Sequence, residues 1–448
     1  MSNKVELDFI NRVQDYISEH QLLLKDKKYI VALSGGADSV ALLLTLSRCG
    51  YHVEAATCNF HLRGEESDRD EMFCVDLCNQ LHITIHRAHF DTRTYASLHK
   101  VSIEMAAREL RYTYFDKLRK DVGCDGICVA HHRDDCVETV LINLLRGTGI
   151  HGLRGILPRN GNILRPLLCV TRKEIETFLG RLHQKYVTDS SNLVDDVMRN
   201  KIRLDLLPML EQITPAARKN IYTTSQNMTE ATTVFDAAMQ QSVENVCLNG
   251  KNEISIENLL KQPSPESTLF SIIREYGFSS PQCLQIIYNL HASSGRIWSS
   301  NTHELLIDRG RILISQKYTS FFSPMRIPEE GIYNFNDKLK ISFAIETISE
   351  NFHIDRSKDC ACLDADTICW PLNIRSVSQG DRFIPFGMRG SKLISDYLTD
   401  CKCSLFEKRR KMVVEDAKKQ IVWLVGERID NRCRIVKSTQ TVLRIALL

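Results

Sequence analysis

The sequence predicts an α/β protein: a doubly wound parallel sheet on the N-terminal side, then a mainly helical middle domain and a small α+β C-terminal domain. In the first part of the chain, short apolar runs rich in β-branched residues alternate with helical segments, the rhythm of parallel strands joined by helices. From about Asp205 to Gln285 the pattern is mainly helical and polar. From Trp370 onward short strands and turns return, with a helix around Ile394–Lys402.

The alternating part begins with Tyr29–Leu33, a short, bulky and partly β-branched run that predicts a strand. The run Val40–Leu46 lacks helix breakers and follows Asp38 and Ser39, so it predicts a helix. The same reasoning predicts strands at 53–60, 83–88 and 126–130 and helices at 66–81, 103–119 and 134–145. Ligands of such sheets lie at the carboxyl ends of the strands, so polar residues that follow different strands can meet in one crevice.

The chain of 448 residues exceeds the usual size of one domain. Pro208 and Pro215 bracket the expected end of the first domain, and 295–316 resembles short strands with turns. We therefore expect a parallel-sheet domain at 1–215, a mainly helical domain at 216–320, a linker with some strand at 321–365 and a basic domain at 366–448.

The basic character of the chain is concentrated near its C-terminus. Residues 370–448 hold 16 Lys and Arg against 8 Asp and Glu, whereas the remainder holds 42 against 47. This imbalance indicates a polyanion partner for the C-terminal part, although a solvated basic face would explain it equally well.

No apolar run is long enough to span a bilayer, and the N-terminus lacks the apolar core of a signal peptide, so we expect a cytoplasmic protein without a membrane partner. The 16 cysteines are scattered between Cys49 and Cys433 and form no C-x-x-C pair. This distribution favours reduced thiols over a disulfide or metal framework.

Residues 34–39 read Ser-Gly-Gly-Ala-Asp-Ser and connect the first predicted strand to its helix. Glycines let the backbone approach a phosphate, unpaired N–H groups at a helix start attract anions, and Ser34 and Ser39 add hydroxyl donors. Neither G-x-x-x-x-G-K-[ST] nor G-x-G-x-x-G is present here. An ordinary turn capped by Ser or Asp is the alternative. The six residues resemble the PP-loop of ATP pyrophosphatases, which split ATP to AMP and pyrophosphate and adenylate a carbonyl oxygen.

A second polar cluster opens the helix after the 126–130 strand. Its carboxylates suit magnesium or an incoming ammonium group, and its histidines suit phosphate contacts or proton transfer. Acids that complement the helix dipole are the alternative. The residues concerned are His131, His132, Asp134, Asp135 and Glu138.

A polar loop begins where the second strand should meet the crevice. Asn59 and His61 are candidate nucleotide contacts at that position. Glu65, Glu66 and Asp68 are better explained as acids at a helix start.

Three basic stretches are candidates for phosphate or RNA contacts. They are the helical Ala107–Tyr112, the Gly-rich loop Leu145–Gly155 and the cluster Arg199–Arg203. Arginine binds phosphate bidentately, and glycines allow close packing on a nucleic-acid backbone. Exposed charged helices and flexible surface loops are the competing interpretations.

Taken together, these stretches resemble the tRNA(Ile)-lysidine synthetase family over most of the chain. The matching segments, in order, are the phosphate turn, 59–66, 107–112, 130–139, 146–155, 165–168, Asp189–Asn192, 199–203, 379–383, 393–400 and 422–430. The resemblance implies that ATP adenylates the 2-carbonyl of the wobble cytidine in tRNA(Ile) with the anticodon CAU, and that pyrophosphate leaves. Free L-lysine then attacks through its ε-amine, AMP leaves and lysidine results.

The general chemistry agrees with this reaction. A carbonyl oxygen is a poor leaving group until it becomes a phosphate ester, and the amine must give its proton to a nearby carboxylate or histidine. The cytidine must also be splayed out of the anticodon stack.

The resemblance also implies roles for individual residues. Catalysis is assigned to Asp38, His131, His132, Asp134, Asp135, Glu138 and Arg203. ATP binding is assigned to Ser34, Gly35, Gly36, Ala37, Asp38, Ser39, Asn59 and His61, with Mg²⁺ on Asp38 and Asp135. Binding of tRNA is assigned to Arg108, Arg111, Arg146, Arg154, Arg199, Arg382 and Arg428, and a homodimer is compatible with the sequence.

Two rival functions follow from the same residues. Another PP-loop enzyme could install sulfur on tRNA, but the absence of a C-x-x-C pair counts against it. A non-catalytic tRNA-binding protein with a degenerate pocket is disfavoured by the intact phosphate turn and acid cluster.

Overall fold

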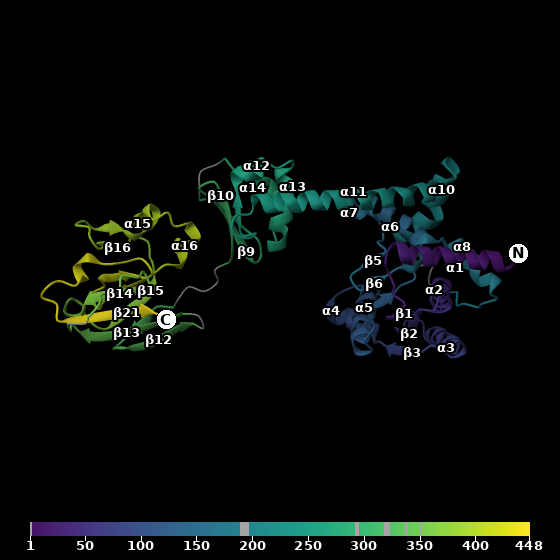
Figure 1. Cartoon of the computed structure of the whole chain (residues 1–448), viewed down its shortest axis with the longest axis horizontal. Helices are drawn as coiled ribbons and strands as arrows, with labels where there is room; N and C mark the ends of the chain where they lie inside the picture. The colour runs from purple at the N-terminus through teal and green to yellow at the C-terminus, as the bar shows by residue number, and fades with distance from the viewer. Residues whose placement is uncertain (1, 189–196, 292–294, 318–322, 337–338, 350–351) are drawn as a thin grey trace. The chain divides into compact units, whose positions relative to one another are not determined.

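The computed structural model describes residues 2–188, 197–291, 295–317, 323–336, 339–349 and 352–448 (Figure 1). The chain divides into two compact units, Met1–Asp236 and Ala237–Leu448. The long helix α11 (Ala217–Val246) contributes to both units. None of the described helices combines the length with the apolar character that crossing a bilayer requires.

The first unit consists of one sheet and the helices that cover it. Its strands are β1 (Lys28–Ala32), β2 (His52–Asn59), β3 (Ile85–His89), β4 (Gly126–Cys128), β5 (Arg159–Asn160) and β6 (Ile163–Leu164). Its helices are α1 (Ser2–Glu19), α2 (Ala37–Arg48), α3 (Glu65–Leu81), α4 (Thr92–His99), α5 (Ile103–Asp121), α6 (Arg133–Leu145), α7 (Ile150–Leu153), α8 (Arg172–Arg181), α9 (Val197–Lys201) and α10 (Leu207–Ile213), with a 3-10 turn η1 (Pro166–Cys169) and a π-helical segment η3 (Ile202–Leu206). The predicted succession of strands and helices in this part of the chain is confirmed, and the acids expected at the start of α3 lie in its first turn.

The strand order of the first sheet is β3-β2-β1-β4-β6-β5. β1 pairs in parallel with β2 on one side and with β4 on the other, and the edge strand β5 pairs antiparallel with β6. The chain therefore leaves β1 toward one edge of the sheet and returns to the opposite side at β4. In an open parallel sheet the ligand crevice lies at the carboxyl ends of the strands, where the order reverses. Here that point falls between β1 and β4.

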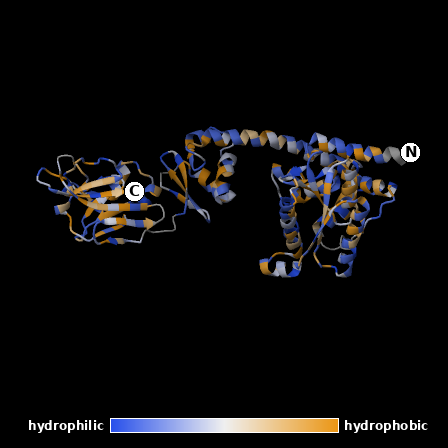
Figure 2. Cartoon of the chain, turned by 60° about the horizontal axis from the view of Figure 1, so that its bottom comes forward, coloured by the Kyte–Doolittle hydropathy of each residue, from blue (hydrophilic) through white to orange (hydrophobic). Residues whose placement is uncertain are grey.

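Both faces of β1 are buried. Tyr29 and Val31 pack into a core formed with α1, α2 and α8, whereas Ile30 packs into a second core with Phe115 of α5. This alternation follows the two-residue period of a strand, and a strand covered on both faces is typical of parallel sheets. Figure 2 shows the matching distribution, with apolar residues on the strands and on one side of the covering helices. The carboxyl end of β1 is thereby fixed in space.

The second unit begins with short helices beside an antiparallel sheet of order β7-β10-β9-β8. The helices are α12 (Ile256–Leu260), α13 (Pro265–Ile273) and α14 (Ser280–Tyr288). The strands are β7 (Glu253–Ser255), β8 (Ile297–Ser299), β9 (His303–Asp308) and β10 (Arg311–Gln316). Two further sheets follow, β11-β15-β18-β19-β20 and β12-β13-β21-β14. Their strands are β11 (Met325–Ile327), β12 (Gly331–Asn336), β13 (Leu339–Thr347), β14 (Cys360–Asp364), β15 (Leu372–Ser376), β18 (Met412–Glu415), β19 (Ile421–Leu424), β20 (Arg428–Ile429) and β21 (Thr441–Leu447). A hairpin of β16 (Arg382–Phe383) and β17 (Lys392–Leu393) precedes α15 (Ile394–Asp400) and α16 (Leu405–Arg410). The α/β fold with a helical middle region is confirmed.

The stretch expected to be a linker with some strand, 321–365, supplies much more strand than we predicted. β11 pairs with β15, and β13 pairs with β21 from Ile341 to Thr347. Ile341 and Phe343 of β13 enter a core that also holds Trp423. Lys340 and Ser342 on the alternate positions are less buried, so this part of the stretch has the alternation of a half-buried strand rather than the composition of a linker.

Two glycines that follow α6 in the chain differ in how closely other residues pack against them. Gly155 has φ +64°, and a Cβ there would lie 2.6 Å from the Cys136 sulfur of α6, whereas Gly161 has φ +57° with open space around its missing Cβ. Replacing Gly161 by Ala should cost about 1 kcal/mol, which is the left-handed backbone cost alone. Replacing Gly155 by Ala should cost roughly 3 kcal/mol, because the overpacking cost adds to it. Thermal unfolding of the two variants checks this difference, and equal losses would contradict the packing described.

Candidate active site

The turn after β1 presents the start of α2 to the crevice without a side-chain cap. Gly36 is the N-cap residue and has no side chain to cap the helix, and no described side chain accepts a hydrogen bond from the first turn of α2. Gly35 has φ +82°, and its carbonyl accepts from the backbone N–H of Val187 at 2.9 Å, which fixes the turn from outside. Ser39 Oγ lies 3.2 Å from Ser34 Oγ and donates to the Gly36 carbonyl at 3.0 Å. The helix therefore keeps free N–H groups at its positive end, which suits an anion.

Asp38 lies in the first turn of α2 and is the only acid of the predicted turn. Its Oδ2 accepts a 2.6 Å hydrogen bond from Arg172 of α8. Its Oδ1 is buried, has no hydrogen-bond partner within the part of the chain that the structure describes, and lies 3.8 Å from His132 Nε2. Burial raises the pKa of Asp38 above its ordinary 3.8, against the opposing effect of His132 and Arg172.

The start of α6 gathers the polar residues predicted to follow β4. His132 is buried, and its ring nitrogens lie 3.5 Å from Asp135 and 3.9 Å from Asp134. Asp135 caps the helix by accepting the His132 backbone N–H at 3.0 Å. Asp134 instead accepts the backbone N–H of Arg172 at 2.9 Å and so joins α6 to α8. The structure thus brings Asp38 and the α6 acids together around one histidine.

Glu138 lies one turn further along α6 and is only 1% exposed. Arg203 donates to both of its oxygens, at 2.6 and 3.0 Å, and Arg199 Nε lies 3.4 Å away. Burial raises the pKa of Glu138, while the pair with Arg203 opposes that rise. The cluster of basic residues near the domain end therefore neutralises a buried acid of α6.

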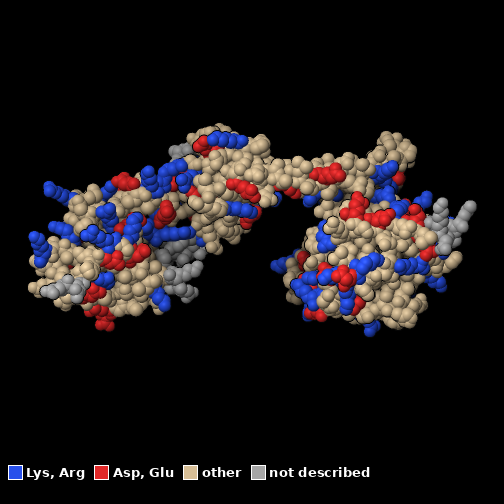
Figure 3. All heavy atoms as spheres, viewed as in Figure 1, with Lys and Arg blue, Asp and Glu red and all other residues tan. Residues whose placement is uncertain are grey.

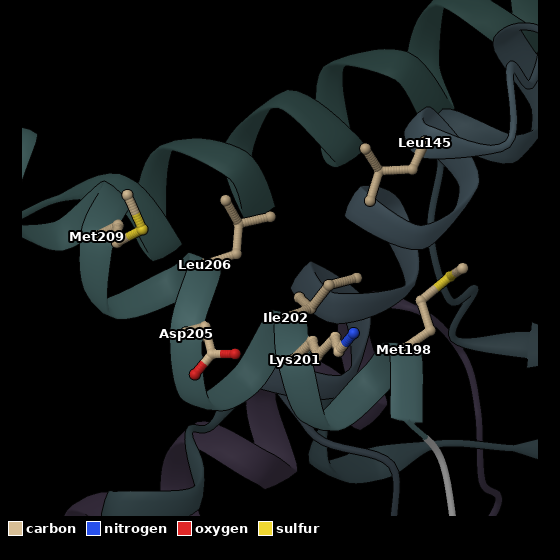
Figure 4. A pocket seen from close by; sticks show the side chains of 7 residues that line it. All are labelled: Leu145, Met198, Lys201, Ile202, Asp205, Leu206 and Met209. Carbon is tan, nitrogen blue, oxygen red and sulfur yellow. The ribbon is translucent and has the colours of Figure 1, made fainter.

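Arg203 belongs to η3, a π-helical segment that helical periodicity does not predict. A hollow of about 510 Å³ borders this segment. Figure 4 shows Leu145, Ile202 and Leu206 lying around the same space. Its lining is Leu145, Met198, Lys201, Ile202, Asp205, Leu206 and Met209.

His131 differs from His132 in its surroundings. Burial lowers the pKa of His131 to about 4. Arg165 Nε donates to His131 Nδ1 at 3.2 Å. A ring that accepts there and has this pKa is neutral near pH 7, so His131 can contact a phosphate only as a neutral donor.

Asn59 and His61 occupy different positions after β2. Asn59 is buried, donates to Asp68 and Glu71 at 2.8 and 3.0 Å and accepts the His61 backbone N–H at 3.0 Å. The polar atoms of the Asn59 side chain are therefore used in hydrogen bonds to α3 and within the loop. His61 is half-exposed and lies 3.0 Å from His89 beside a cavity of about 320 Å³.

The predicted tRNA contacts of the first unit lie on three segments. Arg108 and Arg111 lie on α5, with guanidinium groups 5.2 and 5.1 Å from the rings of Tyr112 and Phe60. Arg146 ends α6, and Arg154 donates from Nε to the His151 carbonyl at 3.2 Å.

In the second unit, Arg382 and Arg428 lie on β16 and β20. Arg382 donates to Ser391, and Arg428 donates to the Phe386 carbonyl at 3.4 Å. Figure 3 shows Lys and Arg side chains crowded over the visible face of the C-terminal part. The segment Asp189–Asn192 lies outside the described residues.

The donor set at α2 and α6 fits a magnesium ion. Among the described residues no group of three or more His, Cys, Asp and Glu side chains forms a metal cluster. Mg²⁺ in nucleotide sites, however, takes one or two carboxylates and completes its shell with phosphate oxygens and water. Asp38 offers a buried oxygen without a hydrogen-bond partner among the described residues, and Asp135 faces the same ring nitrogen of His132, with Oδ2 3.5 Å from Nε2.

Comparison with known proteins adds an independent observation. Residues 5–210 match the family model described as a PP-loop domain, and residues 248–317 match the TilS substrate binding domain. A tRNA(Ile)-lysidine synthase of Parabacteroides distasonis is 44% identical over 98% of this chain and its own full length. The proteins of the same name from Bacteroides thetaiotaomicron and Porphyromonas gingivalis are 44% and 36% identical, covering 96% and 98% of this chain and 98% of their own lengths.

The pairing of Glu138 and Arg203 should make stability depend on pH. The raised pKa of Glu138 means that the folded protein holds this proton more tightly than the unfolded chain. Its contribution to stability is therefore greatest below its ordinary pKa of 4.5 and falls as the pH rises through the folded value. Arg203→Ala should raise that pKa further and cost about 2 kcal/mol near pH 7, with a smaller loss near pH 4.5, because a buried charge loses its partner while Arg199 remains.

Thermal unfolding at several pH values checks this prediction. In the double variant with Glu138→Gln, the extra pH dependence of Arg203→Ala should vanish, because the side chain no longer ionises. A loss that is the same at every pH would contradict the assignment.

Proposed function

The chain belongs to the tRNA(Ile)-lysidine synthase family, and we propose that the crevice between β1 and β4 is where this ATP-using ligase activates its tRNA. The enzyme ligates lysine to the 2-carbonyl carbon of the wobble cytidine in tRNA(Ile) with the anticodon CAU, through an adenylated cytidine, and releases AMP and pyrophosphate. One observation carries the placement: the uncapped N-terminus of α2 lies beside the acids and histidine of α6 at the point where strand order reverses. Thiolation and non-catalytic tRNA binding are not favoured.

ATP binds, in this proposal, with its triphosphate against the start of α2. The backbone N–H groups of the turn and the hydroxyls of Ser34 and Ser39 supply the donors, and the glycines leave room for close approach. Asp38 and Asp135 would hold Mg²⁺, which supplies positive charge to the phosphate oxygens when bound. His131 and His132 line the same space from α6 and the loop before it.

Attack by lysine needs an amine without its extra proton. We assign that proton to one of the α6 carboxylates, Asp134, Asp135 or Glu138, since a general base must lie within hydrogen-bond reach of the amine. The ε-nitrogen then forms a bond to the activated carbon, the bond from that carbon to the adenylated oxygen breaks, and AMP leaves. Arg203, which pairs with Glu138 in the structure, can also bind the departing phosphate, since carboxylate and phosphate both accept paired hydrogen bonds from a guanidinium.

The basic C-terminal part would bind the body of the tRNA and so contribute affinity rather than chemistry. Arg108, Arg111, Arg146, Arg154 and Arg199 would contact RNA from the first unit, while Arg382 and Arg428 would do so from the second. The expected cytoplasmic location and the homodimer stay predictions.

Incubation with ATP, radiolabelled lysine and total tRNA tests the function directly. Label on RNA together with pyrophosphate supports the proposal. Sulfur incorporation without lysine label would point to thiolation, and a tRNA gel shift without pyrophosphate release would point to a binding protein.

Asp38→Asn should separate chemistry from RNA binding. Pyrophosphate release should fall by at least about 10²-fold, because the phosphate turn loses the carboxylate assigned to the cation. Affinity for tRNA should change less than about twofold, since contacts of Lys and Arg with RNA phosphates dominate the binding free energy. Asp116→Asn on α5 is the matched control, and normal turnover by Asp38→Asn would refute the site.

The double variant Arg382→Ala and Arg428→Ala should weaken tRNA binding without changing the chemical step. The slope of log affinity against log salt should fall by about 1 for each lost phosphate contact, while kcat at saturating tRNA stays unchanged. Lys340→Ala, which lies outside the 366–448 segment, is the control. An unaltered salt slope would remove these two residues from the proposed tRNA surface.

A further inference from the structure

Arg172, the first residue of α8, makes hydrogen bonds to the phosphate turn and to α6. Its NH1 donates to Asp38 at 2.6 Å, and its backbone N–H donates to Asp134 at 2.9 Å. Its Nε donates to Glu176, one turn further along α8, at 2.8 Å. Sequence reasoning assigned Arg172 no role, because it lies far from the turn along the chain.

A carboxylate inside an anion-binding turn presents an electrostatic problem. Asp38 sits where the triphosphate is proposed to bind, so it repels the ligand unless a cation stands between them. The guanidinium of Arg172 is the hydrogen-bonded cation on Asp38 in the structure. Of the two oxygens, Oδ2 accepts this bond, whereas Oδ1 is buried and has no hydrogen-bond partner among the described residues.

We propose that Arg172 is a tethered counter-ion that occupies Asp38 until a divalent cation arriving with ATP replaces it. This inference rests on the proposed function, because it needs ATP at the turn. The surroundings suit such an exchange: the Arg172 side chain is 40% exposed, and Glu176 keeps a second bond to it after Asp38 is released.

The start of α8 need not move during this exchange. Asp134 holds its first backbone N–H, and Thr171 and Glu174 form a capping box there. Only the side chain of Arg172 has to leave Asp38, so the exchange requires no rearrangement of the helix.

Mn²⁺ titration in the presence of α,β-methylene-ATP, followed by electron paramagnetic resonance, tests the exchange without turnover. Arg172→Gln should bind Mn²⁺ roughly tenfold more tightly than the unaltered enzyme, since the metal no longer displaces a charge-assisted hydrogen bond. The Mn²⁺ affinity of Arg172→Lys should lie between those of Arg172→Gln and the unaltered enzyme, because lysine keeps the charge and one donor. In an Asp38→Asn background, Arg172→Gln should have no effect.

Arg218→Gln is the matched control. Arg218 also lies near the α6 acids, 3.9 Å from Asp134, but its guanidinium donates to Glu211 rather than to Asp38, so its loss lowers the local positive charge without freeing the Asp38 carboxylate. Equal tightening by Arg218→Gln, or none by Arg172→Gln, would overturn the inference while leaving the proposed ATP site intact. Failure of the unaltered enzyme to bind Mn²⁺ with the analogue would overturn both.

Discussion

Burial of both faces of β1 is the constraint on which the site depends. Tyr29 and Val31 are held by one core and Ile30 by another, so the strand cannot shift in register without exposing one of these sets. Because its end is fixed, the turn that follows is fixed too, and the start of α2 points into the crevice. Ala37 and Ser39 of this uncapped helix start are buried, so its N–H groups gain from any anion that binds there.

The acids of the crevice impose the second constraint. Asp38 and Glu138 are removed from water, and burial raises the pKa of each. Each is therefore paired with an arginine, and neither arginine comes from the strand–helix units that supply the acids. Arg172 opens α8 and Arg203 lies in the π-helical segment, so segments late in the first unit complete a site begun by β1 and β4.

Sequence reasoning predicted the elements whose pattern is local. The turn 34–39, the βα alternation and the acid-rich start of α6 follow from periodicity, glycines and charge near one another in the chain. It missed Arg172 and Arg165, because their roles depend on side chains more than thirty residues away. Nor could it show that the Asn59 amide already donates to two acids of α3 and so is not available to a nucleotide. The strands within 321–365 were underestimated because polar residues on their outer faces masked the period of the inner ones.

The arginine partners also explain how a buried acidic site can accept an anionic substrate. Arg172 and Arg203 are about two-fifths exposed, whereas Glu138 is almost wholly buried. The acids are thus held in place by the fold, and the cations paired with them stand at the entrance. Long, partly solvated side chains can change partner at modest cost, since exposed ion pairs contribute little to stability. In the proposed site, phosphate groups would meet these cations first, so ion pairing within the protein and binding of the nucleotide would use the same positive charges.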